Sequence, residues 1–223
     1  MIITTLILLI IVVSFLGFHH KSKAFIKQHE FIFGFYFTLI ATVMGVFIGF
    51  YLSDQNSIKT EKKHVIELVN VAYKNVLSTI ETNEDILKSY TEIKRSFRLE
   101  FIQDNPLSFP NRLEPILSNE KVSRNISITT YEDVYNTIEK ANHIKTFFEK
   151  KGYKSNLAIG YHYNIVLKNI AEKLQSELQL LKHNITVAQK EEQFKAIDHK
   201  FDRAIAAVYA TQKKKLTKQN EHE

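Results

Sequence analysis

The 223-residue chain contains no cysteine and no tryptophan, and it has only six glycines and three prolines. Without cysteine it has no disulfide, no thiol nucleophile and no Cys-ligated zinc. Beyond residue 52 the only glycines are Gly152 and Gly160, which excludes a glycine-rich phosphate-binding loop there. The Gly-x-Ser-x-Gly turn that presents a serine nucleophile does not occur either. We therefore expect no enzymatic activity and no cofactor.

Arginine is also scarce, although the formal net charge is +6. Specific nucleic-acid surfaces favour arginine because its guanidinium group binds bases and phosphates through two parallel hydrogen bonds. We therefore expect no specific nucleic-acid partner. Lysine carries most of the positive charge, and a lysine-rich surface beside a bilayer is attracted to anionic lipid headgroups.

Two long apolar segments without charged residues dominate the start of the chain, Ile2–Phe18 and Phe31–Leu52. About 20 apolar helical residues cross a bilayer core of about 30 Å, so both segments qualify as spans. A dozen residues join them, which predicts an antiparallel transmembrane hairpin over residues 1–52. We expect no signal-peptide cleavage, because the first segment lacks a basic start and a small-residue cleavage site.

The second segment carries a stripe of small residues at intervals of three or four. These are Gly34, Thr38, Thr42, Gly45 and Gly49. Small residues at this spacing share one helix face and let another helix approach closely in lipid. The stripe predicts a helix-packing surface, which receives either the first span of the same chain or another copy of the chain.

The lysines near the two spans bear on the orientation of the protein. Lys21, Lys23 and Lys27 lie in the connecting loop, and three more lysines follow the second span. The loop lysines lie nearer the apolar edges, so the positive-inside rule favours a cytoplasmic loop. We accordingly expect the rest of the chain to be extracytoplasmic.

Apolar residues at three- and four-residue steps predict long helices after residue 52. The first expected helix covers Lys59–Ile102 and is ended by Pro106 and Pro110. The second begins at Thr129 or Thr130, closes at Lys151 and Gly152, and carries the apolar stripe Val134–Phe148. The last stretch begins at about Asn156 and carries the stripes Tyr163–Ile185 and Phe194–Val208. The fold class is therefore all-α, with three or four long helices in an elongated bundle over residues 53–212 and a charged, flexible tail over 213–223.

Shorter signals refine this prediction. Leu113–Leu117 suggests a short helical turn, and Val122–Ile128 is interpreted as a loop. Thr129 with Glu132, or Thr130 with Asp133, fits a capping box at the start of the second helix. The segment His183–Gln189 is the expected bend between the last two helices. Asn83 interrupts the first apolar stripe, which places it at a helix interface beside a polar partner.

Few residues suggest a chemical site. Glu139 with His143, and Asp198, His199 and Asp202, lie within single turns, but without the two Glu-x-x-His motifs of a carboxylate-bridged di-iron bundle. Surface ion pairs explain them, so we expect no metal. Tyr161, His162 and Tyr163 could bind a ligand at a helix start, or they could be ordinary core and cap residues.

Two stretches carry a resemblance to a known family. Residues 42–63 (TVMGVFIGFYLSDQNSIKTEKK) and 128–144 (ITTYEDVYNTIEKANHI) resemble the membrane exit and the second helix of a family of uncharacterised bacterial membrane-anchored helical proteins. The resemblance implies a bacterial membrane-anchored helical protein and assigns no catalytic residue.

These observations predict a non-enzymatic, multi-pass protein of the bacterial inner membrane that forms homo-oligomers and projects a helical domain. Its expected partners are the lipid bilayer, other copies of the chain and a further protein. A membrane-gating or membrane-disrupting effector of phage defence is one concrete form of this prediction. The alternative is a membrane-anchored sensor that recognises a ligand or partner through Tyr161, His162 and Tyr163.

Overall fold

The computed structural model describes residues 30–151 and 157–220, and every regular element in these residues is helical. The all-α prediction is therefore confirmed for this part of the chain. The first predicted span, Ile2–Phe18, and the loop lysines lie outside the described residues. The chain divides into two compact units, Met1–Lys59 and Thr60–Glu223, and the second unit is called the helical domain below.

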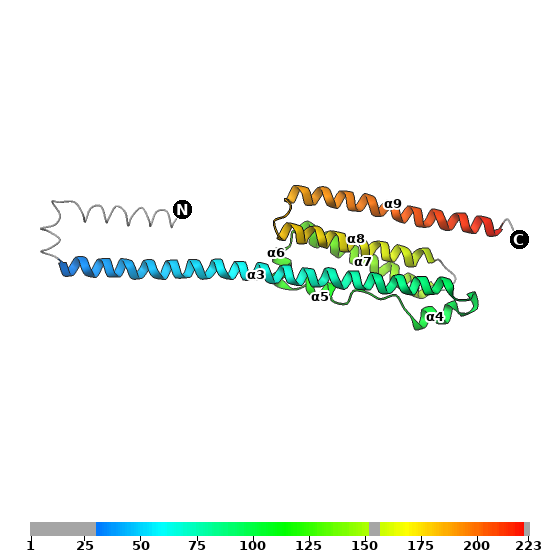
Figure 1. The fold of residues 1–223 in the computed structure, drawn as a ribbon, viewed down its shortest axis with the longest axis horizontal. Helices are drawn as coiled ribbons and strands as arrows, with labels where there is room; N and C mark the ends of the chain where they lie inside the picture. The colour runs from blue at the N-terminus through cyan, green and yellow to red at the C-terminus, as the bar shows by residue number, and fades with distance from the viewer. Residues whose placement is uncertain (1–29, 152–156, 221–223) are drawn as a thin grey trace. The chain divides into compact units, whose positions relative to one another are not determined.

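Helix α3 runs without interruption from Glu30 to Glu92 and belongs to both units. The polar residues after Leu52, which we interpreted as a membrane exit, continue this helix (Figure 1). They include neither proline nor glycine, the residues that most strongly disfavour a helix interior.

The predicted end of this helix at Ile102 is wrong, because α3 ends ten residues earlier, at Glu92. A short 3₁₀ turn, η1 (Arg95–Phe97), and a separate helix, α4 (Arg98–Asp104), follow. The side chain of Arg98 donates to the carbonyl oxygens of Ile93 at 3.1 Å and Thr91 at 3.3 Å. These are carbonyls that the end of a helix leaves without partners, so a residue beyond the break stabilises the break.

Two short helices occupy the connection that follows. The predicted turn is confirmed as α5 (Leu113–Leu117), and its three buried apolar residues anchor it. Our interpretation of Val122–Ile128 as a loop is wrong except at Ile126 and Ser127, because α6 spans Glu120–Asn125 and α7 begins at Ile128. Asn119 caps α6, its side-chain oxygen accepting from the backbone N–H of Lys121 at 3.0 Å.

Three long helices complete the fold, α7 (Ile128–Lys151), α8 (Leu157–Leu181) and α9 (Val187–Asn220). The predicted bend is confirmed at residues 182–186, where His183 has a positive φ of 60°. A capping box begins α9, since Thr186 N–H donates to Gln189 Oε1 at 2.8 Å and Gln189 N–H donates to Thr186 Oγ1 at 3.3 Å. The backbone of α9 is helical through 213–220, and the flexibility of this tail stays a prediction.

The start of α7 differs from the prediction. The capping residue is Ser127, whose Oγ accepts from the backbone N–H of Thr130 at 3.4 Å. Thr130 itself is fully buried and directs its hydroxyl to another helix. The two predicted capping boxes therefore lie two and three residues too late.

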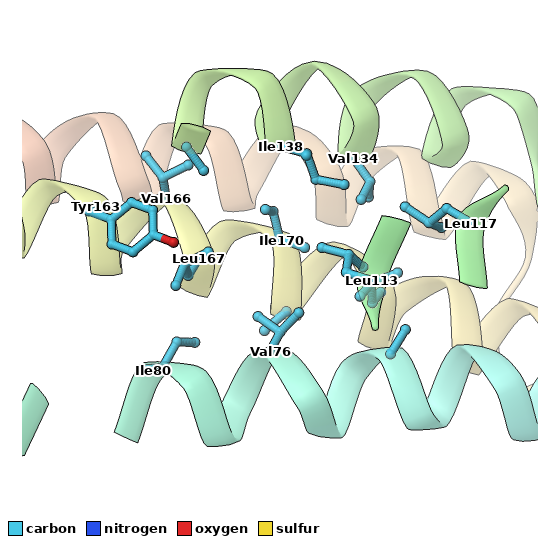
Figure 2. Packing of buried hydrophobic residues seen from close by; sticks show 14 of the residues in the cluster. Val76, Ile80, Leu113, Leu117, Val134, Ile138, Tyr163, Val166, Leu167 and Ile170 are labelled. Atoms are coloured by element: carbon cyan, nitrogen blue, oxygen red, sulfur yellow. The ribbon is translucent and has the colours of Figure 1, made fainter. Parts of the chain in front are cut away.

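One apolar core joins the second part of α3 to the segments from α4 to α8 (Figure 2). The predicted stripe on α3 is confirmed between Val65 and Tyr90, and it packs against residues of α5, α7 and α8 such as Leu113, Ile138 and Ile170. Helix α9 contacts α8 through a separate, smaller cluster, consisting of Phe194, Ile197 and Phe201 with Ile165. Burial of apolar area therefore contributes less to the docking of α9 than to the main core.

Asn83 is completely buried, and its partner is the backbone of the connection after α4. Its amide nitrogen donates to the Ser108 carbonyl at 3.0 Å, and its amide oxygen accepts from the Ser108 N–H at 2.7 Å. Tyr163 Oη donates to the same carbonyl at 2.9 Å. The predicted polar partner is confirmed. The amide of Asn83 pairs with the Ser108 backbone through two hydrogen bonds, as a peptide group would, and thereby fastens the connection after α4 to α3.

We expect Asn83→Leu to lower the free energy of unfolding by about 1–3 kcal/mol, because the Ser108 N–H loses its acceptor and the Ser108 carbonyl loses one of its two donors in a partly buried site. Thermal unfolding of the full chain in detergent, followed by circular dichroism, measures the change. Thr82→Ala, at the exposed neighbouring position, is the control. A variant as stable as the wild type would show that water replaces Asn83 without cost.

Candidate functional site

The apolar part of α3 is the most unusual surface of the described chain. No other helix in the described residues is long and apolar enough to cross a membrane. None of its most apolar 18-residue window is buried, and Phe31 and Phe50 are 89% and 72% exposed. Soluble monomers rarely expose a continuous apolar surface of this length. This segment is therefore not a core helix of the described residues, and its chemistry suits lipid or another apolar helix.

The predicted small-residue stripe lies on this segment. Thr38 donates its hydroxyl to the Gly34 carbonyl at 2.9 Å, and Thr42 donates to the Thr38 carbonyl at 2.8 Å. Both hydroxyl groups thus donate to carbonyl oxygens of their own helix and need no hydrogen-bond acceptor from the surroundings. A Cβ atom placed on Gly34, Gly45 or Gly49 would meet no atom within 4 Å. The stripe is open to a second helix, and the described residues do not cover it.

Tyr161, His162 and Tyr163 do not converge on one site. Tyr163 is fully buried in the main core, where its hydroxyl bonds to Ser108. Tyr161 remains 38% exposed. His162 lies against α9, where its Nδ1 and the Tyr209 hydroxyl are 3.0 Å apart. Successive helical residues point about 100° apart, so three neighbours rarely share one pocket.

His162 has an unusual environment for a histidine. Its Nε2 atom is buried without a hydrogen-bond partner. Burial lowers the pKa of the imidazole below its ordinary value of 6.5, and the positive charge of Lys140 lowers the pKa further. The ring is therefore held neutral between α8 and α9, which indicates a packing role rather than ligand recognition.

A buried ionic network, which our sequence reasoning missed, joins α7, α8 and α9. Glu177 and Lys190 are 1% and 0% exposed, and their charged atoms, Oε2 and Nζ, are 3.5 Å apart. Ser127 donates to Glu177 through its N–H at 2.9 Å and its hydroxyl at 2.8 Å, and Thr130 donates through its hydroxyl at 2.6 Å. A carboxylate held at a helix start is also favoured by the helix dipole.

The hydrogen-bond donors of the Lys190 ammonium group all have partners at the start of α7. This group donates to the hydroxyls of Ser127, Thr129 and Thr130, and it lies 5.0 Å from the centre of the Phe194 ring. Every donor and acceptor of the charged pair has a partner, which is the condition under which a buried ion pair is tolerated. The network therefore fixes helices and offers no free group for chemistry.

The sequence did contain a signal for this network. Glu177 lies three residues after Leu174 and seven after Ile170, on the stripe of α8 that faces the core. Lys190 lies four residues before Phe194 on the corresponding face of α9. A charged residue on an apolar stripe indicates a buried partner of opposite charge.

A second polar layer lies one turn away. The ammonium group of Lys173 contacts Asp198 at 2.9 Å and Asp133 at 3.3 Å, and Asn169 donates to Asp198 at 3.1 Å. A cavity of about 200 Å³ adjoins this layer between α7, α8 and α9. Asn169 is one of the residues that line the cavity, and its Oδ1 atom is buried without a hydrogen-bond partner. These contacts explain Asp198 as an ion-pair partner.

The described residues contain no group of three or more His, Cys, Asp or Glu side chains that could hold a metal ion. His143 and Glu139 are exposed on α7, and His199 and Asp202 are exposed on α9.

The comparisons with known proteins give no further assignment. A scan against family models, a search of curated proteins and a search of solved structures each found no match for this chain. The resemblance of residues 42–63 and 128–144 therefore depends on those residues alone.

We expect Lys190→Met to destabilise the helical domain by about 3–5 kcal/mol, because it leaves the Glu177 carboxylate buried without its counterion. Urea unfolding of the full chain in detergent measures the loss, with Lys195→Met, an exposed lysine on the same helix, as the control. Glu177→Gln combined with Lys190→Met should lose less stability than the sum of the two single variants. Strict additivity would contradict a direct interaction of the two side chains.

A pH dependence follows from the lowered pKa of His162. Below about pH 6.5 the unfolded chain binds a proton at this position that the folded chain does not bind, so acid destabilises the fold. We expect the wild type to lose more unfolding free energy between pH 8 and pH 5 than His162→Gln, while the slopes above pH 8 agree. Parallel curves over the whole range would show that the imidazole is as accessible to protons when folded as when unfolded.

Proposed function

We propose that the chain is a non-enzymatic membrane protein that acts by self-association through the apolar part of α3. The observation that carries this proposal is the uncovered apolar surface between Phe31 and Leu52. A helix of this length and composition is stable in a bilayer, where its backbone bonds are all internal. The first apolar segment, Ile2–Phe18, would form the other half of a two-span hairpin.

Self-association is supported by the geometry of the stripe. Gly45 and Gly49 leave open space on one face of α3, and the hydroxyls of Thr38 and Thr42 are satisfied within the helix. Helices in lipid associate through this kind of close backbone approach. Spans from several copies could then enclose a pore or thin the bilayer, and a membrane-gating or membrane-disrupting effector is the most concrete form of the proposal.

The ligand-sensor alternative has weaker support. Tyr163 belongs to the core, Tyr161 faces away from it, and His162 packs against α9. Tyr161, His162 and Tyr163 do not line the cavity of about 200 Å³, and Asp198, which does line it, already pairs with Lys173. The domain therefore fits a structural role better than ligand recognition.

The absence of native cysteine makes a single-cysteine scan the direct test. The stripe positions are Thr38, Thr42, Gly45 and Gly49, and Val43 and Phe47 on the opposite helix face are the matched controls. Oxidation in vesicles should cross-link copies through the stripe cysteines, because a disulfide requires Cα atoms within about 7 Å. Maleimide, which reacts with the hydrated thiolate, should label Ser57→Cys and spare Phe47→Cys.

The outcomes separate the parts of the proposal. Equal labelling of Phe47→Cys and Ser57→Cys would contradict the membrane span. Equal cross-linking at the stripe positions and at the control positions Val43 and Phe47 would show that the stripe is not the contact between copies. Gly49→Leu should abolish the cross-links of Thr42→Cys, and it should also abolish dye leakage from the same vesicles if the chain gates the membrane.

A further inference from the structure

Three segments that are distant in sequence meet at the end of the helical domain where the chain enters it from residue 59. Lys62 Nζ on α3 lies 2.7 Å from His183 Nε2 in the α8–α9 turn. Asn125 of α6 donates to Glu61 Oε1 at 2.8 Å. Figure 1 shows α6 and this turn beside the same stretch of α3. We call residues 61–64, 119–128 and 182–187 together the proximal surface.

The proximal surface is rich in basic side chains. It carries five lysine or arginine residues against two glutamates; the basic residues are Lys62, Lys63, Lys121, Arg124 and Lys182. Both glutamates are engaged, Glu61 by Asn125 and Glu120 by Arg124. Glu191 and Glu192, one turn further along α9, reduce the local excess of positive charge.

Exposed apolar residues accompany these charges. Ile128 at the first turn of α7 is 72% exposed, and Val187 at the first turn of α9 is 55% exposed. The buried network of Ser127, Glu177 and Lys190 holds these two helix starts together. Basic residues around protruding aliphatic side chains are the composition that binds at a membrane interface.

The covalent chain keeps this surface near the bilayer. Eight residues lie between Leu52 and Glu61, and the nine steps from one Cα atom to the other reach at most about 32 Å even when the chain is fully extended. A tether of this length gives the surface a high effective concentration at the headgroups, so weak contacts suffice for docking.

We infer that the proximal surface binds the anionic headgroups of the bilayer that α3 enters, which orients the helical domain on the membrane. This inference rests on the proposed function. Phosphate-bearing headgroups accept from the lysine ammonium groups, and Ile128 and Val187 insert between them. The docked domain would present the distal end of α3, near Ser89, to the aqueous side.

Fluorescent labels on single cysteines in the full chain test this orientation. Ser123→Cys and Val187→Cys report on the proximal surface, and Ser89→Cys, also exposed, is about 40 Å from Lys62 along α3. The quencher is a lipid with a spin label on its headgroup, in vesicles of phosphatidylcholine alone or mixed with anionic phosphatidylglycerol. A fourth label at Phe47→Cys, with an acyl-chain quencher, reports separately on whether α3 is inserted.

We expect quenching at Ser123 and Val187 in anionic vesicles, weaker quenching in phosphatidylcholine or high salt, and none at Ser89. Lys63→Gln, Lys121→Gln and Lys182→Gln together should lower the ratio of docked to undocked domain about a hundredfold. The control, with the same loss of charge at Lys74, Lys88 and Lys94, should change nothing. Quenching at Phe47 but not at the proximal labels, or quenching that ignores the anionic lipid, would overturn the inference alone. No quenching at Phe47 would overturn the proposed function with it.

Discussion

The apolar side chains between Phe31 and Leu52 need a non-aqueous surrounding that the described residues do not supply. The same helix continues into a segment whose apolar stripe, from Val65 to Tyr90, is buried in a conventional core. Helix α3 therefore meets two different surroundings along one backbone, apolar on all sides first and on one face afterwards. The polar residues after Leu52 separate the two segments, and they belong neither to the continuous apolar segment nor to the buried stripe.

Within the helical domain, apolar packing and buried charged groups stabilise different helix contacts. The main core holds α3 to α8 together through aliphatic contacts, whereas α9 docks on a small cluster around Phe194. The Glu177–Lys190 network, the Lys173 contacts and the His162–Tyr209 contact add polar interactions to the docking of α9. A buried ion pair contributes little net stability, but it penalises other arrangements because misplacement leaves a charge without a partner. Charged contacts therefore determine the register of α9 on α8 more than the burial of apolar surface does.

Local patterns predicted much of this architecture. The all-α class, the short helix at Leu113–Leu117, the bend at residue 183 and the buried stripe all follow from periodicity and turn chemistry. What failed depended on side-chain contacts that apolar periodicity does not show. Arg98 donates to the Thr91 carbonyl at the end of α3, and Ser127 caps α7 while its N–H donates to Glu177. The side chains of residues 161–163 do not form one ligand site, because neighbouring residues of a helix point in different directions. The first span lies outside the described residues, so the hairpin stays a prediction.

The central claim is that α3 is covered by lipid in one segment and by protein in another. Amide hydrogen exchange along α3, measured by mass spectrometry on the full chain in lipid vesicles, tests it most directly, because amides in a bilayer core or a packed core meet little water. We expect two slowly exchanging blocks, residues 34–50 and 65–90, separated by faster exchange at 53–60. Exchange at 34–50 as fast as at 53–60 would contradict the account, since it would show that no lipid covers the apolar segment.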